Sequence, residues 1–186
     1  MKGKIGIIIG VIVLALIAFG IGNYNGLVEK EEAVETAESN IDTALQRRLD
    51  LIPNLVNTVK GYVSHEEQII NDITTARENL LKANTTDEKM TANNELDKAL
   101  NALMVVVENY PDLKANTNFI NLQDELAGTE NRIATARRDY NEVVKTYNTS
   151  IKKFPGSIVA GMFGFEKKPY FEASKDADTV PEVNFE

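Results

Sequence analysis

Residues 5–22 form an uninterrupted apolar run, IGIIIGVIVLALIAFGIG, without one charged or polar side chain. As an α-helix this run would be about 27 Å long, close to the roughly 30 Å of hydrocarbon in a bilayer. Lys2, Lys4 and Tyr24 flank it, as basic and aromatic residues flank membrane spans. The run therefore predicts a transmembrane anchor over residues 1–23.

A cleaved secretory signal peptide is the alternative interpretation, because Lys2 and Lys4 form a basic start and residues 20–22 a small-residue end. The apolar part exceeds the roughly 7 to 15 residues usual in a signal peptide and no Ala-x-Ala follows it, which favours an uncleaved anchor. Two lysines precede the run, whereas only Lys30 lies in residues 23–42. The positive-inside rule then predicts a single-pass cell-membrane protein with its body outside the cytoplasm.

The composition excludes several kinds of site. The chain has 28 acidic and 20 basic residues, a net charge of −8, which argues against a nucleic-acid partner. With no cysteine and one histidine it has no disulfide, no acylated cysteine, no thiol nucleophile and no metal site that needs two imidazoles. Phosphate-loop and nucleophile motifs are also absent. We therefore expect a protein that is not an enzyme, with no catalytic residue, cofactor or metal.

The rest of the chain has a helical pattern. Residues 27–154 contain only two glycines and two prolines, and so few breakers predict helices rather than strands. Apolar residues recur at spacings of three and four along four lines, which include Leu27 to Leu51, Leu55 to Ala83, Ala92 to Tyr110 and Phe119 to Phe154. We predict an all-α fold: a transmembrane helix, an antiparallel up-down four-helix bundle over residues 24–154, and a C-terminal tail over residues 155–186.

Turn-forming residues predict the helix boundaries. The first helix would end near Leu49, with Pro53 starting the second, although Pro53 could instead lie within one continuous helix and lower the helix count by one. The second helix is expected to end near Ala83, and a polar turn over residues 84–87 should start the third. The third helix should stop at Tyr110–Asp112, and the fourth should run from about Leu113 to Lys153.

In this topology the two proline loops, residues 50–55 and 110–116, share the membrane-distal end of the bundle. More polar side chains converge there than two helix turns require, which predicts a site for an unidentified protein partner. The candidate partner-binding residues are Arg47, Arg48, Asn54, Tyr110, Lys114 and Asn116.

Residues 154–165 would return to the bilayer at the opposite end of the bundle. They are apolar and glycine-rich but too short to span a membrane. With lysines at 152, 153, 167 and 168, they are predicted to form an interfacial pad. The alternative, that they fold back to cap the open end of the bundle, stays equally open.

Several charged residues fall on the apolar lines. Arg48 follows Ile41 by one heptad, and the candidate buried polar residues are Glu66, Glu130, Arg132 and Arg137. Buried charges are costly unless paired, so we expect internal ion pairs, with Arg48 near Glu108 and Glu66 near Arg132. The competing interpretation is that these long side chains reach solvent at the edges of the lines.

Several motifs in this order resemble the LemA family: LQRRLDLIPNLV (45–56), VKGYVSHE (59–66), YPDLKAN (110–116) and LQDELAGTENRIATARRDYN (122–141), after one N-terminal span. The resemblance covers nearly the whole chain. It implies a helical-bundle domain anchored to a bacterial membrane, without an established enzymatic activity. The matching positions that merit tests are Arg47, Arg48, Pro53, Asn54, Glu66, Pro111, Asn116, Glu130, Asn131, Arg137, Arg138 and Asn141.

Together these features predict a membrane-anchored interaction or scaffold module at the bacterial cell envelope. The alternative is a membrane-organising or signalling protein that self-associates, through Gly6 and Gly10 on one face of the span, and works on the bilayer. The expected partners are the bacterial membrane, an unidentified protein and, in the alternative, a second copy of the chain, but not nucleic acid.

Overall fold

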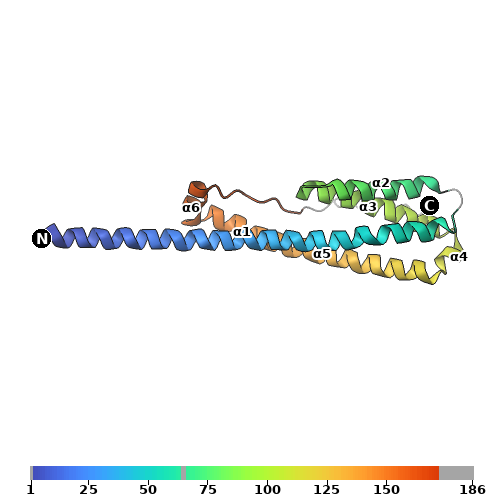
Figure 1. Ribbon diagram of the computed structural model, residues 1–186, viewed down its shortest axis with the longest axis horizontal. Coiled ribbons are helices and arrows are strands. Elements are labelled where there is room, and N and C mark those ends of the chain that lie inside the picture. The colour runs from blue at the N-terminus through green and yellow to red at the C-terminus, as the bar shows by residue number, and fades with distance from the viewer. Residues whose placement is uncertain (1, 64–65, 172–186) are drawn as a thin grey trace, which may run out of the picture. The chain divides into compact units, whose positions relative to one another are not determined.

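A computed structural model describes residues 2–63 and 66–171 (Figure 1). His65 lies outside these residues. Every secondary-structure element in these residues is a helix, which confirms the all-α prediction. The helices are α1 (Lys2–Lys60), α2 (Glu67–Lys82), α3 (Thr86–Val107), α4 (Pro111–Lys114), α5 (Thr117–Lys152) and α6 (Gly156–Phe163).

Helix α1 is continuous (Figure 1). Pro53 lies inside it. The predicted end near Leu49 and the predicted start of the second helix at Pro53 are therefore wrong, because α1 ends at Lys60 and α2 begins at Glu67. The alternative that Pro53 lies within one continuous helix is the one observed. Among the described residues four helices longer than three turns, α1, α2, α3 and α5, still follow one another.

A hydrogen bond from another helix explains why Pro53 is accepted. Proline has no N–H, so the carbonyl of Leu49, one turn earlier, loses its helical partner. The Nε of Arg77 in α2 donates to this carbonyl at 3.0 Å. The apolar face of α1 also continues past the proline, with Ile52, Leu55 and Val59 all buried. Packing and this bond together offset the helix-breaking effect of Pro53.

The turn between α2 and α3 forms as its sequence predicts. Thr85 precedes α3 and its hydroxyl accepts a hydrogen bond from the Glu88 N–H at 3.2 Å, while the Glu88 carboxylate accepts one from the Thr85 N–H at 3.0 Å. Backbone N–H groups of Asn84 and Thr85 hold the pKa of Glu88 below its usual value. This reciprocal capping box confirms the predicted start of the third helix.

The predicted single helix from about Leu113 to Lys153 is divided in two. Pro111 starts the one-turn helix α4, and α5 begins at Thr117. Asn116 lies at the junction, where its side-chain oxygen accepts a hydrogen bond from the Phe119 N–H at 3.0 Å. Asn116 therefore caps α5, which is why a new helix begins there.

Most residues on the four predicted apolar lines are buried. Five of them are 0% exposed: Ile41, Leu96, Phe119, Ile133 and Tyr147. Two members that lie just beyond helix ends are exposed instead: Tyr62 after α1 and Phe154 after α5. The helical period thus identified the core, except where a line runs out into a turn.

Contacts divide the chain into two compact units, which are described separately. Of the described residues, one unit comprises 2–40 and 136–170, and the other comprises 41–63, 66–135 and 171. In the first unit, α1 contains an 18-residue window of mean hydropathy 2.5, none of it buried, so by length and composition it is able to cross a membrane. The predicted division at residues 23 and 154 stays a prediction.

In the first unit, residues 165–170 run back along α5. The side chain of Asn148 donates to the carbonyl of Lys168 at 2.9 Å and accepts from its N–H at 3.0 Å. The Lys168 ammonium forms an ion pair with Glu31 of α1 at 2.8 Å and lies 6.0 Å from the ring centre of Tyr147. These contacts join α1, α5 and the segment that follows α6.

Two groups in this cluster have raised pKa values. The hydrogen bond from Lys168 to Glu31 raises the pKa of the ammonium. Burial, followed by the Glu31 charge, raises the pKa of the Tyr147 hydroxyl. Both groups therefore stabilise the fold fully below the unfolded-state pKa values, about 10 for tyrosine and about 10.4 for lysine. That contribution is lost as the pH rises through the folded-state values.

Our first prediction concerns this pH dependence. Replacing Lys168 by methionine should lower the melting temperature at pH 8, because the ion pair with Glu31 is lost. The difference from the unmodified protein should begin to shrink above about pH 10.4, the ordinary lysine value, and should vanish as the pH rises through the raised pKa of Lys168 in the folded state. Thermal unfolding followed by circular dichroism between pH 8 and pH 11.5 measures both curves. A difference that stays constant over this range would contradict the assignment.

Our second prediction concerns the carbonyl of Leu49. Arg77→Met should destabilise the protein by roughly 1 to 3 kcal/mol, the usual cost of an unsatisfied buried polar group. The loss should be smaller in a Pro53→Ala background, because the N–H of Ala at 53 restores the helical hydrogen bond. A double-mutant cycle in urea unfolding measures this coupling. Strictly additive effects would show that Arg77 does not compensate for the proline.

Candidate functional site

In the second unit, α1 and α5 border a polar groove with a volume of about 430 Å³. Asparagines dominate its walls, and all four are exposed. The lining residues are Asn54, Asn57 and Thr58 from α1, with Asn118, Asn121, Leu122 and Glu125 from α5. Among the described residues, none of these four side-chain amides has a hydrogen-bond partner in the protein, so their donors and acceptors face solvent.

Hydrogen-bonded pairs lie beyond the two ends of the groove. At one end Arg47 of α1 donates to Glu125 of α5 at 2.7 Å, and this contact lowers the pKa of Glu125. One turn after Thr58, Tyr62 accepts a hydrogen bond from the amide of Asn116 at 2.8 Å. We call the groove lined by Asn54, Asn57, Asn118 and Asn121 the asparagine groove. The groove and the two pairs at its ends form a polar surface along α1 and α5, from Arg47 to Asn116.

The loop around α4 adds a second group of polar contacts. The Tyr110 hydroxyl donates to Glu66 at 3.2 Å, and burial with the nearby Glu66 charge raises the pKa of Tyr110. The Lys114 ammonium pairs with Glu108 at 2.7 Å, and both side chains are exposed. Leu113 of the same turn is completely buried. The turn is thus anchored by one apolar residue and displays its charges outward.

Five of the six predicted partner-binding residues lie on this surface or beside it. Tyr110, Lys114 and Asn116 are together at α4, while Arg47 and Asn54 lie farther along α1. The expectation that residues 50–55 share one tip with residues 110–116 is wrong, because α1 continues to Lys60 and Tyr62 and Glu66 take that place. Arg48 does not face outward at all, since only 4% of it is exposed.

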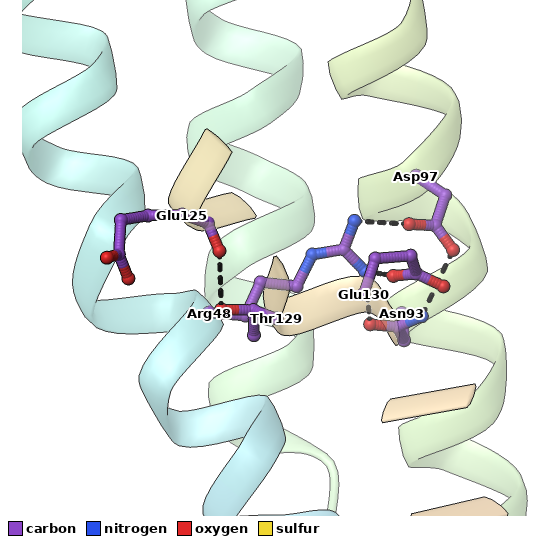
Figure 2. Close-up of polar contacts among 6 residues, drawn as sticks. All are labelled: Arg48, Asn93, Asp97, Glu125, Thr129 and Glu130. Atoms are coloured by element: carbon purple, nitrogen blue, oxygen red, sulfur yellow. Dashed lines mark hydrogen bonds and ion pairs between the residues drawn. The ribbon is translucent and has the colours of Figure 1, made fainter. Parts of the chain in front are cut away.

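Arg48 instead joins three helices from the inside (Figure 2). Its guanidinium donates to the amide oxygen of Asn93 at 2.8 Å and forms ion pairs with Glu130 at 2.9 Å and with Asp97. Asn93, which is completely buried, also donates to Asp97 at 3.1 Å. The planar fork of arginine suits such a multiple contact, which fixes the register of α1 against α3 and α5.

The partners predicted for Arg48 and Glu66 are wrong. Arg48 pairs with Asp97 and Glu130 rather than with Glu108, and Glu66 accepts from Tyr110 rather than meeting Arg132. Arg132 is exposed, so its predicted burial is also wrong. Glu66, Glu130 and Arg137 are half-buried.

Sequence reasoning missed several polar residues with structural or surface roles. Buried Asn93 and Asn148 lie next to the apolar lines, and an asparagine beside a core line was the available signal. The groove asparagines gave a different signal, because 54, 57, 118 and 121 repeat at spacings of three within each helix. That spacing places each pair on one helix face.

The side chains of the groove are able to form hydrogen bonds. A carboxamide carries both a donor and an acceptor, like the peptide group, and the groove has little uncompensated charge because Glu125 is paired with Arg47. In the part of the chain that the structure describes, no three His, Cys, Asp or Glu side chains are grouped as a metal site would require. The groove could therefore hydrogen-bond a neutral polar segment.

Our third prediction separates two adjacent arginines. Arg48→Met should destabilise the protein by about 2 kcal/mol. This loss is smaller than the loss expected on breaking a fully buried ion pair, because Asp97 and Glu130 still reach solvent. Arg47→Met is the matched control and should cost at most about 1 kcal/mol, since its pair with Glu125 is exposed. Urea unfolding measures both values. Equal losses would contradict the structural role of Arg48.

Comparison with known proteins identifies the family. The LemA family model matches residues 37–185. Magnetosome protein MamQ 1 of Paramagnetospirillum magneticum is 30% identical over 90% of this chain and 71% of its own length. The Magnetospirillum gryphiswaldense MamQ protein is 26% identical over 96% and 76% of the two chains, and Protein LemA of Metamycoplasma hominis 26% over 86% and 75%. None of these names is that of an enzyme. The chain belongs to the LemA family.

Proposed function

We propose that this protein is a non-enzymatic, membrane-anchored interaction module that binds an extended segment of a partner protein in the asparagine groove. The observation that carries the proposal is the set of four exposed asparagines on facing helices, at a groove of about 430 Å³. Their amides are able to pair with a peptide backbone without selecting for charge. The predicted residues Arg47, Asn54 and Asn116 lie along the same surface.

The anchor in this proposal is the apolar start of α1, crossing the bacterial membrane once with the rest of the chain outside the cytoplasm. The length and hydropathy of that segment support it. Relatives named for the magnetosome are compatible with a role at a membrane, although the name describes those proteins. Since α1 is continuous, the span and one wall of the groove belong to the same helix.

The groove requires that α1 and α5 lie in a stable bundle, and we propose the antiparallel up-down arrangement of α1, α2, α3 and α5. Contacts between α1 and α3 advance together, from Asp42–Lys89 to Arg48–Asn93. Contacts along α1 and α5 advance in opposite directions, from Arg47–Glu125 to the pair of Tyr62, just after α1, and Asn116, just before α5. These directions are the ones expected for alternating helices.

Our fourth prediction tests the groove in cells. A photoreactive amino acid at position 118 should form an adduct with a partner protein, and Asn57→Arg or Asn121→Arg should abolish that adduct by filling the groove. Both positions are exposed, so the substitutions leave the core intact. Adducts are detected by gel electrophoresis and identified by mass spectrometry.

Asn101→Arg is the matched control, because Asn101 is exposed on α3 and does not line the groove. It should leave the adduct unchanged. Loss of the adduct in all three variants, or its persistence in both groove variants, would refute the proposal. An adduct with twice the mass of the 20.6 kDa chain would identify a second copy in place of a different partner.

A further inference from the structure

Helix α6 has one buried and one exposed apolar face. Val159 and Ala160 are buried against Leu27 of α1, with Ile151 and Phe165 packed beside them. The large apolar side chains that remain exposed are Phe154 (78%), Ile158 (55%), Met162 (73%) and Phe163 (61%). A cluster of this kind on so short a helix is unusual for a surface that faces only water.

The packing of α6 against α5 and α1 is specific. A Cβ at Gly156 would lie 2.3 Å from the carbonyl oxygen of Ser150, so only glycine fits where α6 begins. Gly164 ends the helix with a φ of 79°, a left-handed conformation that glycine adopts without strain. The ring of Tyr24 lies 4.8 Å from that of Phe163 and 5.7 Å from that of Phe165. The exposed face is therefore held in place and is not a loose end.

Between α1 and α6 lies a groove with a volume of about 610 Å³. Its walls are formed by residues between Leu16 and Tyr24 of α1, by Phe154 and Pro155 just before α6, and by residues of α6 up to Phe163, and nearly all of them are apolar. The amide of Asn23 is already used, because it donates to the carbonyl of Phe19 at 2.8 Å within the same helix. Water would thus find few hydrogen-bond partners in this groove.

We propose that this groove holds acyl chains of the bilayer and that α6 is an interfacial helix whose exposed face enters the hydrocarbon. The inference rests on the membrane span of the proposed function. One wall, Leu16 to Ile21, is part of the 5–22 apolar run, so lipid chains surround it wherever that run crosses a bilayer. The groove and the exposed face of α6 continue that surface beyond the span.

The recognised chemistry is the hydrocarbon chain and not the lipid headgroup. Exposed lysines flank α6 at positions 152, 153 and 167, but exposed glutamates at 29, 32 and 166 belong to the same unit and offset their charge. Binding should therefore not require anionic lipids. A zwitterionic vesicle is a sufficient test membrane.

Our fifth prediction uses the absence of tryptophan from the chain. In the full-length protein, reconstituted in phosphatidylcholine vesicles, a single tryptophan at Met162 should lose fluorescence when the acyl chains carry bromine. The loss should be comparable with that of Leu14→Trp within the span. Met162 is 73% exposed, so the substitution does not disturb the packing of α6. Asp139→Trp, exposed on α5, should show no loss.

The outcomes separate this inference from the anchor. If Leu14→Trp is quenched and Met162→Trp is not, the span stands and the lipid-bound α6 is refuted. If neither is quenched, both the span and the inference are refuted. Met162→Cys tests the other occupant, since the natural chain has no cysteine. Disulfide-linked dimers at low protein-to-lipid ratio, with Met162→Trp unquenched, would place a second copy on α6 and overturn the proposal.

Discussion

The hydrogen bond from Arg77 to the carbonyl of Leu49 is the contact on which the arrangement of the second unit depends. A proline inside a helix leaves the carbonyl one turn earlier without a partner and disfavours the helix by about 3 kcal/mol. Because α2 supplies the missing donor, α1 continues for seven residues beyond Pro53 to Lys60. Asn54, Asn57 and Thr58 then remain on the helix that faces α5, where they form one wall of the asparagine groove.

The same contact decides which residues meet at the turn. If α1 ended at Leu49, residues 50–55 would lie beside the α4 loop. With α1 extended, Tyr62 and Glu66 take that position and bind Asn116 and Tyr110. Asn116 is thereby used twice, as the cap of α5 and as the donor to Tyr62. The candidate residues were predicted to lie together at one end of the bundle, whereas in the structure they lie along α1 and α5.

Features that depend on neighbours within one helical turn could be predicted from the sequence. The spacing of apolar residues identified the helices and most of the core, and the polar turn over residues 84–87 identified the start of α3. Arg48 replaces an apolar residue a heptad after Ile41, so its burial was one of two interpretations that the sequence left open, although Arg48 was also a candidate for partner binding. Its partners were not foreseen, since depth was counted from the wrong turn. Moving that turn by about ten residues brings Asp97 and Glu130, not Glu108, to the guanidinium.

The sequence by itself determined the helical class, the apolar start of α1 and the motifs of the LemA family. These follow from composition and from periods that one helix contains. Only the tertiary structure decided where α1 ends, which charges pair, and how residues 154–165 divide into a face against Leu27 and a face left exposed. The physical reason is that a buried polar group needs a partner wherever the fold brings one. Arg77 lies 28 residues from Leu49, and Asp97 lies 49 from Arg48, far beyond any local pattern.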